Sequence, residues 1–286
     1  MTVTMKGSDV AAAMKEELLA EVERLGRHGI VPTLGIVRVG ERPDDLAYER
    51  GARKRLEGVG MRCEVFAFPE AISQPDFERA FAAVNENPEI HGILLFRPLP
   101  KHLDEEAVKR TIHPAKDIDC MGAHNIAKVF SGDETGFPPC TPEAVMRVLR
   151  HYGVDVEGRR VTVVGRSMVV GKPLTMLLIK QNATVTVCHT RTKNLAETCR
   201  EAEILVAAAG KARMIKGDFV AEGATVIDVG INVDEEGKLC GDVDFDAVAP
   251  RAARITPVPG GVGAVTSSVL AEHVARAARY LHGIAE

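Results

Sequence analysis

A glycine-containing loop near the middle of the chain could bind a nucleotide. The apolar run 160–164 is followed at once by Gly165, and an apolar helix is expected from Leu174, shortly after Gly171. Such a loop points backbone N–H groups and the positive end of a helix dipole at a phosphate. The spacing fits neither G-x-G-x-x-G, because Ser167 stands at the second glycine, nor a Walker A loop, because Pro173 replaces the Ser or Thr that binds magnesium. An ordinary glycine-rich turn is the alternative.

The end of the next expected strand, 183–187, indicates which dinucleotide would bind. NAD sites usually place an Asp or Glu there, about twenty residues after the glycine loop, to accept a hydrogen bond from the ribose 2′-hydroxyl. This chain has His189, Thr190 and Arg191 instead. Together with Arg166 of the glycine loop, Arg191 supplies positive charge for a 2′-phosphate. The segment favours NADP over NAD, with two ordinary surface arginines as the alternative.

Two series of alternating helices and strands must position these residues. In the second half, the expected strands lie about twenty residues apart, which is typical of right-handed crossovers in a parallel sheet and predicts a Rossmann-type domain. The first half predicts another α/β domain. Strands are expected at 33–40, 62–68, 91–96, 160–164, 183–187, 204–209 and 225–229, with a last extended segment at 255–258. Helices are expected at 8–25 with Ser8 as N-cap, 44–58, 77–85, 142–152, 174–180 and 267–281, and 113–142 reads as a polar connection.

Composition and charge exclude several classes of protein. With 286 residues, 45% hydrophobic and 27% charged, the chain can build and cover a core, so it is not disordered. A net charge of -4 without long single-sign runs predicts no nucleic-acid partner and no membrane surface. No apolar run is long enough for a membrane span, and the N-terminus is too charged for a signal peptide, which predicts a cytoplasmic protein. The six cysteines are scattered singly, so we expect reduced thiols and no metal site.

Several motifs, taken together and in order, resemble those of the methylenetetrahydrofolate dehydrogenase/methenyltetrahydrofolate cyclohydrolase (FolD) family. Each is weak alone, but the set covers almost the whole chain in register. The motifs are Pro98-Leu99-Pro100, Lys116-Asp117-Ile118-Asp119, Pro139-Cys140-Thr141-Pro142, Val164-Gly165-Arg166-Ser167, Val170-Gly171-Lys172-Pro173 and Thr256-Pro257-Val258-Pro259-Gly260-Gly261-Val262-Gly263.

The resemblance implies a homodimer whose protomers carry two α/β domains with folate bound in the cleft between them. It implies a folate-binding domain at 1–120 plus 265–286 and a Rossmann-type NADP-binding domain at 121–264. In the family, NADP takes a hydride from 5,10-methylenetetrahydrofolate to give the methenyl cation, and the same site hydrolyses this product to 10-formyltetrahydrofolate. These steps serve purine, methionine and formyl-methionine supply.

The resemblance also implies roles for individual residues. Tyr48 matches the tyrosine that packs beside folate at the active site, and Asp119 matches the aspartate that holds the pterin ring, where a carboxylate accepts from a ring N–H and an amino group together. Without the family, Tyr48 would be a half-buried packing residue and Asp119 a turn residue. The remaining matches are Pro259, Gly260 and Gly261 in the loop that closes over substrate, and Gly165, Arg166, Ser167, Gly171, His189 and Thr190 at the cofactor.

Two departures from the family fall where the chemistry is expected. The family has a lysine four residues after the tyrosine, one turn on along the same helix face, and here that position is Ala52. At 100° per residue, Lys54 lies on another face unless the helix is distorted. Phe96 stands where the family usually has a glutamine that hydrogen-bonds the lysine. Losing both argues against a neutral accident, because an orphaned buried glutamine is costly, whereas Ala and Phe can pack.

These departures predict a retained dehydrogenase and an impaired cyclohydrolase. Hydride transfer depends mainly on positioning two rings, whereas hydrolysis needs a positioned acid or base. Tyr48, His124 or a repositioned Lys54 are the alternatives for that proton transfer. Two other hypotheses are a catalytically silent folate- or nucleotide-binding paralogue, and a dehydrogenase acting on a different pterin one-carbon carrier. Asp45 and the segment 120–122 also differ from the usual family residues, and Phe96 together with the segment 120–122 motivates the latter hypothesis.

Overall fold

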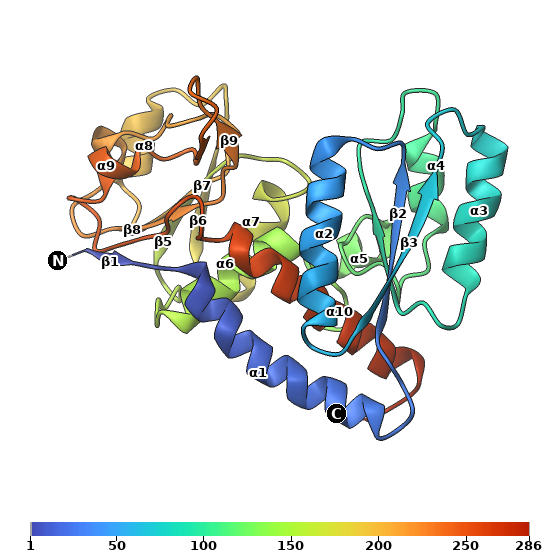
Figure 1. Ribbon diagram of the computed structural model, residues 1–286. Coiled ribbons are helices and arrows are strands. Elements are labelled where there is room, and N and C mark those ends of the chain that lie inside the picture. Colours follow the sequence, from blue (N-terminus) through green and yellow to red (C-terminus); the bar gives the residue numbers. More distant parts are fainter. Residues whose placement is uncertain (1, 286) are drawn as a thin grey trace. The chain divides into compact units, whose positions relative to one another are not determined.

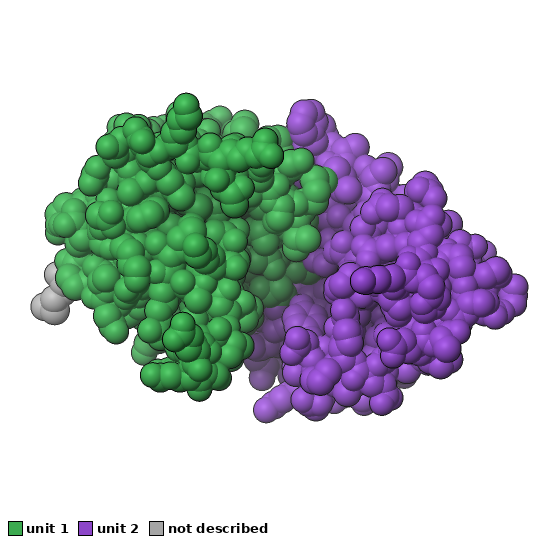
Figure 2. Space-filling view, turned by 90° about the horizontal axis from the view of Figure 1, so that it is seen from above, with its two compact units in different colours: residues 1–13, 139–266 green, residues 14–138, 267–286 purple. Residues whose placement is uncertain are grey.

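The protein divides into two compact units. The structure is a computed structural model and describes residues 2–285. Unit 1 comprises residues up to 13 together with 139–266, and unit 2 comprises 14–138 with 267 onward; Figure 2 colours the two units. The chain passes between the units inside helix α1 (Gly7–Gly26), again at 138/139, and inside helix α10 (Gly263–Leu281).

Unit 1 contains a parallel six-stranded sheet in the order β1-β11-β8-β7-β5-β6 (Figure 1). From β5 the chain goes first to β6 on one side and then to β7 on the other, so the strand order reverses at β5, where α/β proteins bind ligands beyond the carboxyl ends of the strands. The strands are β1 (Val3–Thr4), β5 (Arg160–Val164), β6 (Thr184–Cys188), β7 (Ile204–Ala207), β8 (Thr225–Asp228) and β11 (Arg254–Ile255). The helices are α6 (Cys140–His151), α7 (Gly171–Lys180), α8 (Leu195–Arg200) and α9 (Phe245–Val248). A small antiparallel pair joins β9 (Asn232–Val233) to β10 (Leu239–Cys240).

Unit 2 contains a parallel three-stranded sheet in the order β3-β2-β4. The strands are β2 (Thr33–Val39), β3 (Arg62–Phe68) and β4 (Gly92–Leu95), and the helices are α2 (Pro43–Glu57), α3 (Gln74–Glu86), α4 (Glu105–Thr111) and α5 (Ala123–Ser131). On one face, Val37 and Leu95 pack in a core with Phe77 and Phe81 of α3 and Val108 of α4. Because side chains alternate along a strand, Arg38 and Phe96 turn to the opposite face, where α2 and α10 lie (Figure 1).

The fold confirms the predicted α/β class, and several details differ from the sequence-based expectations. The segment read as a polar connection contains α5, and α4 precedes it. Ser8 is not an N-cap, because α1 already begins at Gly7 and the Ser8 hydroxyl donates to Asp9. None of the helices among the described residues has the length and hydropathy of a membrane span.

The unit boundaries also differ from the expected 120/121 and 264/265. The first residues belong to unit 1 because β1 pairs with β11. Residues 121–138 belong to unit 2, where Asn125 of α5 donates to the carbonyl oxygens of Pro114 and Asp117. At the other end of this segment, Arg276 of α10 lies over the ring of Phe137.

A buried histidine makes the stability of unit 2 depend on pH. His91 is buried, and its pKa is lowered from 6.5 to about 4 by burial and by the nearby His282 and Lys116. Its Nδ1 accepts from the backbone N–H of Thr33, and its Nε2 lies 3.1 Å from Nε2 of His282. Between about pH 6.5 and pH 4 the unfolded chain binds a proton that the folded chain does not, so stability falls as the pH is lowered through this range.

We therefore expect His91 to remove about 3 kcal/mol of stability between pH 7 and pH 4. The measurement compares urea unfolding of the unchanged protein and His91→Asn across this range. The difference in unfolding free energy between the two proteins should shrink as the pH falls. A pH-independent difference would contradict the assignment of this titration to His91.

Candidate functional site

The glycine loop follows strand β5, and the segment 189–191, which is expected to bind the 2′-phosphate, follows strand β6. Both begin at the same edge of the unit 1 sheet. Val164 of β5 is paired with Cys188 of β6, and the N–H of Gly165 donates to the carbonyl oxygen of Cys188 at 2.9 Å. The segment beginning at His189 therefore starts directly beside the glycine loop. This edge is also where the strand order reverses.

Two glycines in this loop have no room for a side chain. A Cβ on Gly165 would collide with the carbonyl oxygen of Ala208, and the φ of Gly165, +140°, also disfavours any other residue. A Cβ on Gly171 would collide with the carbonyl oxygen of Gly165. The loop thus closes tightly onto the first turn of α7, with five residues between its two glycines.

Ser167 shapes the loop with both its side chain and its backbone. Its hydroxyl oxygen accepts from the N–H of Val170 at 3.0 Å, and its carbonyl oxygen accepts from the N–H of Lys172 at 3.0 Å. The side chains of Arg166 and Ser167 are exposed. The loop therefore presents a cation and a hydroxyl to solvent next to the positive end of α7.

The segment after β6 forms a tight turn. The N–H of His189 donates to the hydroxyl oxygen of Thr192 at 2.9 Å, and Nδ1 of His189 accepts from the N–H of Arg191 at 3.2 Å. Thr190 and Arg191 are exposed. The donors of this turn and Arg166 fit the phosphate groups of a dinucleotide, and no carboxylate stands at the position where an NAD site accepts from the ribose.

The Pro259–Gly261 loop is held by the start of the chain. The N–H of Gly7 donates to the carbonyl oxygen of Gly260 at 2.8 Å, and Gly260 has a φ of +95°. A Cβ on Gly7 would collide with the carbonyl oxygen of Gly261. Gly7 was missed in the sequence, where its position at the head of an amphipathic helix was the only signal of a close approach.

In unit 2, Tyr48 and Phe96 meet edge to face. Tyr48 lies on α2 and is 41% exposed, whereas Phe96 follows β4 and is 7% exposed. The ring centroids are 5.8 Å apart at an interplanar angle of 77°. The structure thus places Tyr48, the tyrosine expected to pack beside folate, against Phe96, which stands where the family usually has a glutamine. The phenylalanine ring supports one side of the tyrosine.

Ala52, which stands where the family has a lysine, is buried in the same helix as Tyr48. Ala52 lies one turn after Tyr48 and is only 2% exposed, so its methyl group is part of the core. Lys54 is exposed, and α2 runs as a continuous helix from Pro43 to Glu57. Lys54 therefore keeps the direction that a regular helix predicts and is not repositioned toward Tyr48.

Asp119 is presented by a turn that a second aspartate builds. Asp117 is buried, and its carboxylate accepts from the N–H groups of Met121 and Gly122 and from Nδ2 of Asn125. Burial raises the pKa of Asp117, although these three donors oppose the shift. Asp119 itself is half-buried. Asp117 was not among the predicted site residues, although its place in the Lys116–Asp119 motif was a signal.

A charged pair beside Tyr48 was also missed. Arg38 is the one charged residue in strand β2 (Thr33–Val39), and its Nε lies 3.0 Å from Oε2 of Glu49 on α2. A single charged residue in a buried strand requires a partner, so the pattern of β2 itself was the signal.

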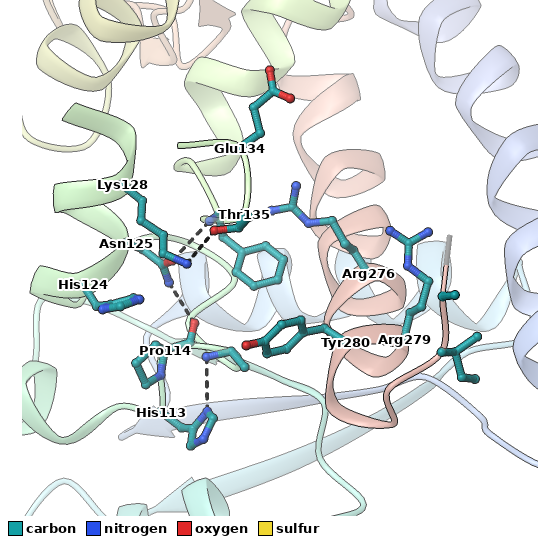
Figure 3. Close-up of a pocket in the computed structure, with 14 residues that line it drawn as sticks. His113, Pro114, His124, Asn125, Lys128, Glu134, Thr135, Arg276, Arg279 and Tyr280 are labelled. Atoms are coloured by element: carbon teal, nitrogen blue, oxygen red, sulfur yellow. Dashed lines mark hydrogen bonds between the residues drawn. The ribbon is translucent and has the colours of Figure 1, made fainter. Parts of the chain in front are cut away.

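A separate cavity of about 890 Å³ lies in unit 2 between α5 and α10. Figure 3 shows Lys128 donating to Thr135, with Arg276 and Tyr280 of α10 facing the same space. His124 lines this cavity. None of the residues predicted to bind folate or NADP lines it.

Two models of one protein family match this chain. The tetrahydrofolate dehydrogenase/cyclohydrolase catalytic domain matches residues 5–119, and the NAD(P)-binding domain of the same family matches residues 139–282. The chain belongs to the FolD family. The bifunctional protein FolD of Alkaliphilus oremlandii is 56% identical over 99% of this chain and 100% of its own length.

Solved structures of FolD proteins have the same fold. The FolD enzyme of Campylobacter jejuni is 36% identical, with a TM-score of 0.95 over 98% of this chain and 99% of its own. The Trypanosoma brucei FolD, complexed with NADP and an inhibitor, is 38% identical, with a TM-score of 0.91 over 98% of both chains. These matches confirm the predicted family, fold class, enzyme class and NADP cofactor. The roles of single residues stay predictions.

Proposed function

We propose that this FolD protein oxidises 5,10-methylenetetrahydrofolate with NADP and hydrolyses the methenyl product slowly or not at all. The proposal includes the homodimer that the resemblance implies and the cytoplasmic location that the composition and the charged N-terminal segment predict. The observation that carries it is the apolar pair Ala52 and Phe96, both buried, beside a retained Tyr48.

The residues proposed to bind the cofactor lie in unit 1. Gly165 and Gly171 close the loop at the carboxyl end of β5, and Arg166 and Arg191 supply charge for phosphate groups. NADP, when bound, supplies the hydride acceptor. The chain itself has to orient cofactor and folate and exclude water, and positioning of this kind needs no proton carrier at position 52.

The folate half lacks a group that hydrolysis needs. Water that attacks the methenyl carbon must lose a proton, and a C–N bond must then break with proton transfer to the leaving nitrogen. A methyl group at Ala52 and a phenyl ring at Phe96 can neither accept nor donate that proton. Lys54 is exposed on another face of α2, and His124 lines a separate cavity. Tyr48 is the one candidate left beside these two positions.

Time-resolved absorbance tests the proposal directly. Purified protein is mixed with 5,10-methylenetetrahydrofolate and NADP, and NADPH and the methenyl chromophore are followed together. We expect both to rise, and the methenyl compound to decay no faster than it does without enzyme. Methenyl substrate added alone is the control.

Other outcomes have distinct meanings. Enzymatic decay of the methenyl compound would contradict the loss of hydrolysis and would point to Tyr48 as the proton carrier. Absence of NADPH, with NADP and folate still raising the unfolding temperature, would replace the proposal with a silent binding paralogue. Absence of NADPH with stabilisation by NADP only would favour a different one-carbon carrier.

A further inference from the structure

An ion pair between two largely buried side chains joins helix α2 to the end of strand β2. The side chains of Arg38 and Glu49 are 11% and 12% exposed, and Nε of Arg38 lies 3.0 Å from Oε2 of Glu49. Nη1 of Arg38 also donates to the carbonyl oxygen of Gly40 at 2.7 Å. One guanidinium group therefore holds the strand, the loop after it and the helix together.

The pair lies beside the contact between Tyr48 and Phe96. Continuing the parallel register of β2 and β4 places Arg38 and Phe96 side by side on one face of the sheet. On α2, the consecutive residues Tyr48 and Glu49 contact these two side chains, Tyr48 meeting Phe96 and Glu49 meeting Arg38. The direction of Glu49 and the direction of Tyr48 are thus fixed by the same turn of helix.

Stability alone does not account for this pair. Moving two charges out of water costs much of what their attraction returns, and apolar residues of similar size at both positions are often at least as stable. The N-cap residue of α2, Arg42, makes no capping hydrogen bond with its side chain, which pairs instead with Asp45 of the first turn. That pair is local to the start of the helix, whereas the pair of Arg38 and Glu49 ties the helix to the sheet. The ion pair is placed where it can hold the first turns of this helix.

We propose that Arg38 is a positioning residue for Tyr48. Through Glu49 it fixes the first turns of α2, so that Tyr48 presents its ring to the folate substrate against Phe96. The planar fork of the guanidinium group reaches Glu49 and Gly40 at once, which a lysine ammonium cannot do with the same geometry. The inference rests on the proposed function, because it assigns Tyr48 to the folate site.

Three variants test the role of the pair. Arg38→Met leaves a buried carboxylate without its partner, Arg38→Met/Glu49→Leu replaces the pair by apolar groups, and Arg38→Lys keeps the charge but not the fork. For the double variant we expect an unfolding temperature above that of Arg38→Met, and a dehydrogenase kcat about 10-fold or more below that of the unchanged protein. The KM for NADP should not change, because the cofactor residues lie in unit 1. Arg38→Lys should restore part of kcat.

A double variant with the unfolding temperature and the kcat of the unchanged protein would overturn the proposal and make the pair purely structural. If the double variant does not fold, Arg38→Lys decides: a lowered kcat at unchanged KM for NADP supports the proposal, and an unchanged kcat overturns it.

A spectroscopic arm separates this inference from the proposed function. The chain has three tyrosines and no tryptophan, so Tyr152→Phe/Tyr280→Phe leaves Tyr48 as the only tyrosine. If the unchanged protein forms no NADPH, the proposed function fails, and the near-ultraviolet circular dichroism of Tyr48 then reports on its positioning. Loss of that signal in Arg38→Met/Glu49→Leu supports the role of Arg38, and an unchanged signal overturns it.

Discussion

Changing Ala52 to Lys and Phe96 to Gln together is expected to give the protein a methenyl hydrolysis about 10²- to 10⁴-fold faster than that of the unchanged chain. Position 52 lies one turn after Tyr48 on the same face of α2, so a lysine there extends toward the tyrosine. Phe96 already contacts Tyr48, so a glutamine in its place is within reach of the same region. The pair supplies the proton carrier and the hydrogen-bonding partner that two buried apolar side chains cannot provide.

The two single variants should not share this gain. Ala52→Lys buries an ammonium group beside a phenyl ring, and that charge must either find a partner or lose its proton. Phe96→Gln buries an amide without a partner, at a cost of about 1–3 kcal/mol. We therefore expect each single variant to be less stable than the double variant. The unfolding free energies of the unchanged protein, the two single variants and the double variant form a double-mutant cycle, which measures the coupling between positions 52 and 96.

Absorbance of the methenyl compound, followed with and without enzyme, provides the rate. Lys54→Ala is the matched control: its side chain is exposed on another face of the same helix, so both the hydrolysis and the dehydrogenase rate should stay unchanged. A folded double variant that forms NADPH normally and hydrolyses no faster than the unchanged chain would show that hydrolysis is not controlled at positions 52 and 96.

The sequence predicted elements well where apolar residues are regularly spaced. The strands at 62–68 and 160–164 have the predicted bounds, and the order of the second βα series follows from the spacing of its strands. The helices α4 and α5 were missed, because they are short and lie in polar, proline-containing sequence. Strand β1 has only two residues and exists through its pairing with β11, about 250 residues away, which no local pattern reveals.

Residues that belong to a sequence motif could be proposed for the candidate site from the sequence. Residues that join it only through contacts between distant parts of the chain were missed. The glycine loop and the segment at His189 could be proposed from local sequence, whereas Tyr48 was proposed only from the family resemblance, and the roles of all three stay predictions. The partner of Arg38 was not predicted, because Glu49 is selected by the packing of α2 on the sheet rather than by a fixed spacing. Gly7 was missed for the same reason, since its tight contact with Gly261 arises only when the two ends of the chain meet in unit 1.

Gly171→Ala is expected to weaken NADP binding and to lower kcat/KM for NADP by about 10²-fold. The added methyl group would collide with the carbonyl oxygen of Gly165, which is backbone and cannot rotate away as a flexible side chain could. The collision moves the strand-to-helix loop, and with it the N–H of Gly165 that donates to Cys188. The donors at the carboxyl end of β5 then no longer point at one phosphate position.

Titration calorimetry with NADP measures the effect, and two variants serve as controls. Gly26→Ala adds a methyl group at the end of α1, where no atom lies within 4 Å, so NADP binding should not change. Lys172→Ala changes the residue next to Gly171 but keeps its N–H, which donates to Ser167, and should have a much smaller effect than Gly171→Ala. If Gly171→Ala binds NADP as tightly as the unchanged protein does, the tight closure of this loop is not what holds the cofactor. The exposed Arg166 and Arg191 would then have to hold it through charge alone, and NADP affinity would fall steeply with added salt.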